Sequence, residues 1–162
     1  TQTSGYLVIN ASKNPALTGL GLNRVAARAV QSSGQSFATG AINTILWDSA
    51  KVFDTTGSMN TATGIYTAPE VGYYQIVCQY TVAEATVSTH SLLLYKNGVL
   101  FNQNNLVIPS ATNATYTQVL SDTLFLNKGD TVELRFSQNS GTTRSAAAGA
   151  NFNILNITKV SV

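Results

Sequence analysis

Apolar and polar residues alternate along several stretches of the chain, and this period of two predicts β-strands because successive strand side chains point to opposite faces. The longest such stretch is Gly72–Ala83. Its more apolar face carries Tyr74, Ile76, Cys78, Tyr80 and Val82. Its other face is mixed and carries Tyr73, Gln75, Val77, Gln79 and Thr81. We therefore expect the first face to lie in the core, with Cys78 as a buried, unreactive thiol.

A second clear alternation covers Thr131–Ser137, which follows a turn at Asn127–Asp130. It predicts that Val132, Leu134 and Phe136 point inward. Further strands are predicted at Val25–Val30, Thr44–Phe53, Ile65–Ala68, Ser91–Lys96, Tyr116–Leu126 and Asn151–Val160. No segment shows a helical stripe. Short strands separated by turn residues predict a single all-β sandwich or barrel.

Two local features refine this pattern. Asn97-Gly98 stands between two apolar runs and predicts a tight hairpin, because both turn residues must take positive φ. In the last strand the apolar phase changes between Ile154 and Ile157, so either both faces are covered or a bulge intervenes. We assign residues 25–162 to the β domain and residues 1–24 to an extended N-terminal arm or the end of an upstream module.

Composition narrows the class of protein. Charged residues make up only 10% of the 162 residues, whereas Thr, Ser and Asn number 21, 15 and 15. Neutral polar side chains must supply the solubility, as is common in durable extracellular or virion proteins. The net charge is +2 and the basic residues are scattered, which argues against a nucleic-acid partner. No apolar run approaches the ~18 residues of a membrane span, so membrane insertion is not expected.

Several sequence pieces occur in a recognisable order. They are Phe53-Asp54-Thr55-Thr56-Gly57, Thr61–Pro69 with Gly72-Tyr73-Tyr74, Leu94–Gly98, Leu124–Val132 and Phe152–Val160. Together they resemble the C1q-like globular head of the complement and tumour necrosis factor (TNF) superfamily, over about residues 25–162. The resemblance implies a ten-stranded jelly-roll sandwich that assembles as a homotrimer. The chain departs from many animal members in lacking most of their cysteines and a collagen Gly-X-Y stalk.

The charge-poor composition and the phrase Thr67–Tyr74 resemble versions of this head in bacteriophage and other viral fibre proteins. That resemblance implies a non-enzymatic trimeric head, on a virion tail or head fibre, that attaches to a host-surface glycan or protein receptor. Its other partners would be further copies of itself and other virion or fibre proteins. Two alternatives stay open: a capsid-decorating or fibre-capping trimer without its own ligand, and a secreted C1q-like lectin of cellular origin.

Catalytic and metal chemistry find little support in the sequence. His90 is the one histidine and has no G-x-S-x-G elbow beside it, so we expect a surface or strand-end residue. The seven carboxylates form no close pair along the chain. No Cys/His cluster has metal-ligand spacing, and no cofactor is predicted. Some members of the resembled family bind calcium near the trimer axis; Asp48 and Asp54 are the nearest candidates here, with solvated loops as the alternative.

The predicted ligand contacts are Phe101, Asn102, Gln103, Asn104, Asn105, Tyr116 and Arg144. Amide and hydroxyl groups without competing charge, near an aromatic ring, are what carbohydrate recognition needs. Arg144 belongs to the loop Ser137–Ala148, which is rich in such groups. The alternative is that both segments are solvated turns. Trp47 is expected to pack as a strand residue rather than to serve as a sugar platform.

Overall fold

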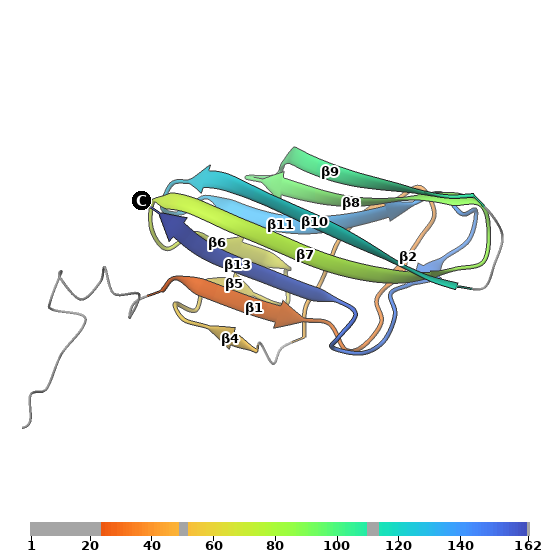
Figure 1. Ribbon diagram of the computed structural model, residues 1–162, viewed down its shortest axis with the longest axis horizontal. Helices are drawn as coiled ribbons and strands as arrows, with labels where there is room; N and C mark the ends of the chain where they lie inside the picture. Colours follow the sequence, from red (N-terminus) through yellow and green to blue (C-terminus); the bar gives the residue numbers. More distant parts are fainter. Residues whose placement is uncertain (1–23, 49–51, 110–113, 162) are drawn as a thin grey trace, which may run out of the picture.

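The protein is described by a computed structural model that covers residues 24–48, 52–109 and 114–161, so the predicted arm lies outside the described residues apart from Arg24. Two antiparallel sheets face each other in an elongated sandwich (Figure 1). The strands are β1 (Ala26–Val30), β2 (Ser36–Phe37), β3 (Ile42–Thr44), β4 (Phe53–Asp54), β5 (Met59–Asn60), β6 (Ile65–Thr67), β7 (Gly72–Glu84), β8 (Ser88–Lys96), β9 (Val99–Ile108), β10 (Ala114–Leu126), β11 (Thr131–Gln138), β12 (Arg144–Ser145) and β13 (Ile154–Ser161).

One sheet has five strands in the order β10-β7-β13-β1-β4. The other has six, in the order β5-β6-β11-β8-β9 with β3 paired to β11, and a separate ribbon joins β2 to β12. The predicted all-β jelly-roll sandwich is confirmed; the additional strands are pieces of two or three residues. The described residues contain no helix, and hence none long and apolar enough to cross a membrane.

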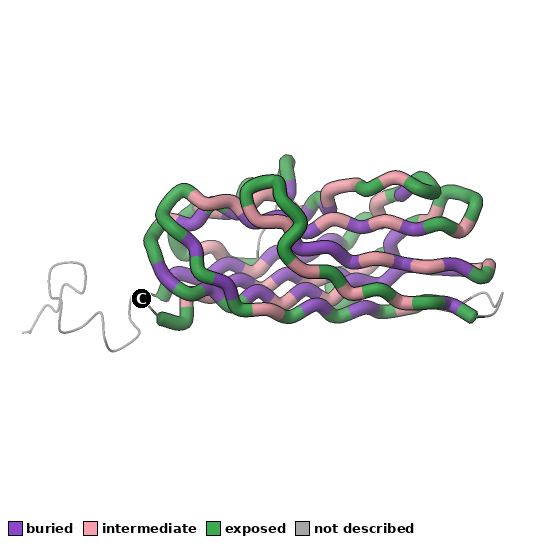
Figure 2. The backbone as a smooth tube through the Cα atoms, turned by 90° about the horizontal axis from the view of Figure 1, so that it is seen from above, coloured by how far each residue is buried: buried purple, intermediate pink, exposed green. Residues whose placement is uncertain are grey.

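The core lies between the two sheets, and burial alternates along the long strands (Figure 2). Tyr74 and Cys78 are buried as predicted, and burial raises the pKa of the Cys78 thiol. Phe136 is also buried and lies 4.9 Å from the ring of Phe37 and 5.7 Å from that of Tyr80. Such aromatic packing adds to the free energy gained from area burial alone.

The predicted hairpin is confirmed at the turn between β8 and β9. Asn97 has φ of 51° and Gly98 has φ of 74°, the pair of positive angles that a tight turn of this kind requires. Asn97 also donates from Nδ2 to Oδ1 of Asp130, 2.9 Å away in the turn that precedes β11. The two turns at this end of the sandwich therefore support each other.

The predicted strand 44–53 is wrong for residues 45–48, which are not strand, and its residues 49–51 lie outside the described residues. Pairing with β11 continues just past β3, where the amide of Ile45 donates to the carbonyl of Leu134 at 2.9 Å. The amide of Asp48 instead bonds the carbonyl of Val30 in the other sheet, at 2.8 Å. This segment therefore crosses from one sheet to the other. Trp47 is buried as expected, but in that crossing rather than in a strand.

The final strand begins at Ile154, three residues later than predicted. Its register against β7 is regular from Ile154 to Lys159, and a bulge follows before Ser161. The phase change seen in the sequence arises because Ile154 faces outward while Leu155 and Ile157 enter the core. Neither predicted explanation holds in full: the outer face at Ile154 is half-covered, and the bulge lies further along.

The described chain enters and leaves the sandwich at the same end. The amide of Lys159 donates to the carbonyl of Val25 at 2.9 Å, which places the start of β1 beside the end of β13. The connection 85–87 and the residues 139–143 lie at the opposite end (Figure 1). A module joined before residue 24 would therefore leave those loops at the far end of the domain.

Candidate functional site

The outward face of the five-stranded sheet is almost free of charge. Its central positions, read from the register of β7, β10 and β13, are Gln75, Val77, Gln79, Val119, Ser121, Thr123, Asn156 and Thr158. Among the described outward positions of β1, β7, β10 and β13, the one charged residue is Arg28 of β1. Its Nη1 donates to Oδ1 of Asn156 at 3.1 Å. We call this surface the uncharged face.

Large apolar side chains stand exposed on the uncharged face. Tyr73 is 46% exposed, Val119 51% and Phe125 42%, and the rings of Tyr73 and Phe125 meet edge to face at 5.3 Å. Phe53 of β4 is also exposed, and it pairs with Arg28 at the edge of the same sheet. Depletion of charge together with enrichment in aromatic residues distinguishes the buried centre of protein interfaces from ordinary surface.

The outward face of the six-stranded sheet has a different chemistry. Glu133 and Arg135 form an ion pair of 2.6 Å, and the guanidinium of Arg135 lies 3.9 Å from the ring centroid of Tyr95. Burial by itself raises the pKa of Glu133, but its bonds to Arg135 and Thr44 outweigh that effect and lower it. The two opposite charges of this face are paired within one copy of the chain, in contrast to the almost uncharged opposite sheet.

The predicted ligand segment 101–105 forms part of β9, the edge strand of the six-stranded sheet, rather than a turn. Phe101, Gln103 and Asn105 are exposed. Asn102 and Asn104 are half-buried and cross to β10: Nδ2 of Asn102 donates to a carboxylate oxygen of Asp122 at 2.7 Å, and that of Asn104 to the carbonyl of Val119 at 2.8 Å. These two amides close the side of the sandwich, which leaves three residues of the segment for a ligand.

The remaining two predicted contacts come from other strands. Tyr116 is half-buried near the start of β10. Arg144 is half-buried at the loop end, where its Nη2 lies 2.8 Å from Oε1 of Glu84. Arg144 and the two inward amides of the β9 segment are thus held by different partners.

His90 is buried rather than at a surface or strand end, which corrects the sequence-based expectation. It lies within β8, is 1% exposed, and its Nε2 is 3.0 Å from Oε2 of Glu84. The alternation of β8 did not reveal this, because a single polar residue at an inward position looks like an interruption of the strand. Its partners come from other strands and are invisible in the local sequence.

The suggested calcium ligands are engaged in other bonds. Asp48 accepts from the amide of Ser32 at 2.9 Å, and also from its hydroxyl. Asp54 accepts from the amides of Ser58 and Met59 at 3.1 and 2.9 Å, which fixes the turn before β5. In the part of the chain that the structure describes, no three His, Cys, Asp or Glu side chains come close enough to hold a metal ion.

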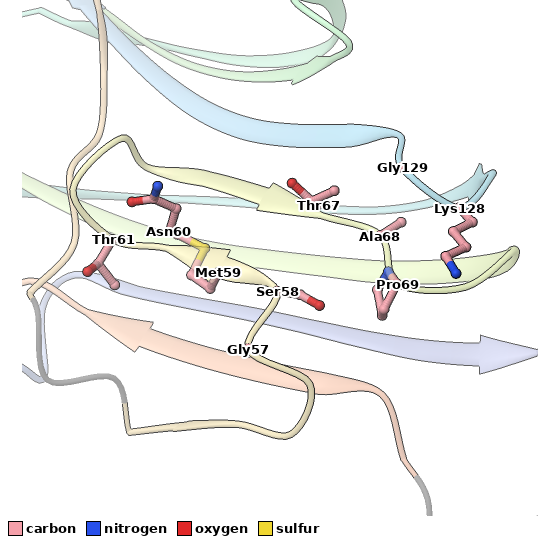
Figure 3. Close-up of a pocket in the computed structure, with 10 residues that line it drawn as sticks. All are labelled: Gly57, Ser58, Met59, Asn60, Thr61, Thr67, Ala68, Pro69, Lys128 and Gly129. Atoms are coloured by element: carbon pink, nitrogen blue, oxygen red, sulfur yellow. The ribbon is translucent and has the colours of Figure 1, made fainter.

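A shallow hollow of about 770 Å³ lies beside β5 and β6, at the end where the chain enters and leaves (Figure 3). Ser58, Asn60, Thr67 and Lys128 are the lining residues that carry hydroxyl, amide or amine groups. Its residues come from the β5–β6 hairpin and from the turn before β11.

Three comparisons with known proteins bear on the fold. Neither protein-family models nor curated proteins match the chain. Among solved structures, Eiger TNF from S. frugiperda is 18% identical, with a TM-score of 0.68 over 86% of this chain and 94% of that one. The globular domain of zebrafish complement 1qA is 14% identical, with a TM-score of 0.59 over 83% and 96%. Murine APRIL is 13% identical, with a TM-score of 0.64 over 85% and 99%.

The fold is that of TNF and C1q globular domains. At these identities the likeness extends to the fold alone, and it covers nearly the whole of each matched domain. The jelly-roll expectation drawn from residues 53–74 and the later motifs is therefore confirmed independently of those motifs.

Proposed function

We propose that this domain is a non-enzymatic binding module that works as a homotrimer. The observation that carries the proposal is the uncharged face, where exposed Tyr73, Val119 and Phe125 lie among neutral amides and hydroxyls. A monomer gains nothing from exposing such a surface, whereas a threefold assembly can bury it against the next copy without desolvating charge on this face. The TNF and C1q fold supports a threefold arrangement, which the sequence resemblance also implies.

Assembly through this face places three sets of loops at one end. Residues 85–87 and 139–143 of each copy would point away from the end where the chain enters and leaves. Each contact with a surface ligand is then weak alone, and three linked contacts raise the apparent affinity through effective concentration. The exposed residues Phe101, Gln103 and Asn105 of β9 offer a second surface on the flank of each copy.

In its specific form, the proposal is that the trimer forms the head of a viral or phage fibre and attaches to a host-surface glycan. The charge-poor composition supports it, and so does the position of the loops 85–87 and 139–143 at the end away from the chain's entry. A secreted recognition domain of cellular origin is the second candidate, favoured by the fold shared with complement and TNF proteins. A fibre-capping or decorating trimer would use the uncharged face without any ligand at the loops.

Light scattering combined with binding tests this proposal. We expect a mass of about three times 17.1 kDa at micromolar concentration. The labelled domain is then presented to bacterial cells, animal cells and a glycan array, with free sugars as competitors. Saturable binding to bacterial cells that one sugar blocks supports the fibre head, and binding to animal cells supports the cellular candidate. A trimer without binding supports capping, and a monomer overturns the assembly.

The location of the contact is tested by matched variants. Gln103→Ala and Asn105→Ala remove exposed amides on β9, while Thr142→Ala changes an exposed hydroxyl in the loop 139–143. We expect at least one set to reduce glycan binding about tenfold or more, since a lost polar contact to a bound ligand costs ~1.4 kcal/mol or above. Unchanged binding in both sets would place the contact elsewhere.

A further inference from the structure

Three ionisable side chains meet inside the loop end of the sandwich. Glu84 ends β7, His90 lies in β8 and Arg144 begins β12. Oε2 of Glu84 is 3.0 Å from Nε2 of His90, and Oε1 is 2.8 Å from Nη2 of Arg144. The side chains of Glu84 and His90 are 0% and 1% exposed, and that of Arg144 is 17% exposed. In a chain with so few charges, this cluster demands a physical account.

The Glu84 carboxylate is the centre of the cluster. Besides His90 and Arg144, its donors are the amides of Ala85 and Thr86 and the hydroxyls of Thr86 and Ser88, at 2.7 to 3.0 Å. Burial alone raises the pKa of this carboxyl, but the hydrogen bonds outweigh it and lower the pKa to about 2. An ionised carboxylate only accepts, so Nε2 of His90 carries the hydrogen of their shared bond.

Arg144 connects this centre to the loop 139–143. Its Nε donates to Oγ of Ser140 at 3.0 Å and its Nη2 to Oγ1 of Thr86 at 3.0 Å. Gln138 supports the same loop, because its Nε2 donates to the carbonyl of Thr142 at 2.8 Å. Arg144 therefore links the loop to Glu84, in addition to the bonds from Gln138 that do not involve the cluster.

The charge balance of the cluster changes when His90 takes up a proton. With a neutral imidazole, the charges of Glu84 and Arg144 cancel. The groups that face His90 from the surrounding strands are Glu84, Arg144, the Phe136 ring at 5.3 Å, Gln138 and Leu106 opposite it in register, and Gln118, which donates to its carbonyl. None of them apart from Glu84 is an anion, so a protonated His90 leaves a net positive charge in a buried site.

We propose that Glu84, His90 and Arg144 form a proton-sensitive latch on the loop 139–143. In the closed state Glu84 holds Arg144, and Arg144 holds the loop. A proton from solvent adds to Nδ1 of His90, since Nε2 already carries one. The imidazolium then satisfies the carboxylate, and Arg144, the one member that reaches solvent, leaves with the loop. The latch controls the loop 139–143 whatever ligand that loop binds, so it stands independently of the proposed function.

Two effects on His90 agree with this arrangement. Burial lowers the pKa of His90, the bond to Glu84 offsets part of that effect, and the charge of Arg144 lowers it further. If proton uptake weakens the hold on Arg144, then by linkage the presence of Arg144 weakens proton uptake to the same degree. Removing Arg144 must therefore raise the pKa of His90.

The first test measures that linkage by NMR. His90 is the one histidine, so after removal of any affinity tag its imidazole signals need no assignment. We expect Arg144→Gln to raise the pKa of His90 by about one, a tenfold gain in proton affinity. Arg28→Gln is the control, because this arginine is also half-buried and hydrogen-bonded, but its partner is Asn156 on the uncharged face. An equal pKa in wild type and Arg144→Gln, both showing folded spectra, overturns the latch.

The second test follows the loop itself. Hydrogen exchange of residues 139–147 is compared above and below the measured pKa of His90, with rates corrected for the intrinsic effect of pH. His90→Gln retains a side-chain donor for Glu84 but takes up no proton. We expect protection to fall about tenfold or more on acidification in wild type and to stay constant in His90→Gln. Equal loss in both proteins, or no loss in wild type with His90 protonated, overturns the proposal.

Discussion

Replacing Val119 by aspartate probes the uncharged face at its centre. Val119 lies in the middle of β10, opposite Gln79, and is 51% exposed in one copy of the chain. In a single copy the new carboxylate points into water, so the fold itself should lose less than ~1 kcal/mol, the range of β-strand preferences. In the proposed trimer the same carboxylate is buried three times.

The cost of that burial follows from the chemistry of the face. Arg28 is the one described cation pointing outward there, and it lies three strands away from β10 and is bound to Asn156. An unpaired buried charge costs several kcal/mol even after relaxation. Taking about 3 kcal/mol for each copy, the affinity of each subunit for the assembly falls by a factor of about 100 or more.

Light scattering and sedimentation velocity measure the outcome. Val107→Asp is the matched control, because Val107 is 67% exposed on β9 of the other sheet and receives the same change in charge and shape. We expect Val119→Asp to be a folded monomer at low micromolar concentration while Val107→Asp assembles like wild type. If both variants remain trimers of equal stability, the uncharged face is not the interface.

Three further predictions concern stability. Phe136→Ala should cost about 3–5 kcal/mol, because it empties a fully packed aromatic site, and an unchanged urea midpoint would contradict the core assignment. The pKa of His90 is lowered in the folded state, so its contribution to the free energy of unfolding should be complete above its ordinary pKa of ~6.5 and should be lost as the pH falls below that value. The pKa of Glu84 is lowered to about 2, so the free energy of unfolding should fall a second time between about pH 4.5 and 2. A free energy of unfolding that does not change between pH 7 and 5 would refute the prediction for His90. Gly64→Ala should lower the melting temperature far more than Gly57→Ala. Both glycines have positive φ, but an added Cβ at Gly64 meets a backbone carbonyl, whereas one at Gly57 meets nothing. Equal shifts in melting temperature would show that backbone strain alone decides the effect.

Long alternating strands were predictable because their burial pattern is written locally. The inward residues of β7 and β11 follow from a period of two, and the hairpin follows from Asn97 and Gly98. The crossing at 45–48 was not predictable in this way. Ile45 and Trp47 are both buried and alternate like a strand, although their backbone passes between two sheets.

The candidate site shows the same division. Composition predicted a surface with little charge, and the sequence itself showed the amide-rich segment 101–105. Its burial was not visible: Asn102 and Asn104 turn toward β10 because β9 is the edge strand beside it. Exposed and half-buried residues alternate from Phe101 to Asn105 as in any strand, but polar side chains stand on both faces, so the sequence does not reveal which face the neighbouring sheet covers.

The sequence by itself determined the fold class, the inward face of each long strand and the turn residues, because these depend on neighbours a few positions apart. The tertiary structure decided which sheet face is left uncovered and which charges meet. Glu84 and His90 lie six residues apart, yet Arg144 reaches them from 54 residues beyond His90, through the packing of β12 against the end of β7. Interactions between residues so far apart in the sequence depend on how the strands pack, and the local alternation of apolar and polar residues does not predict that packing.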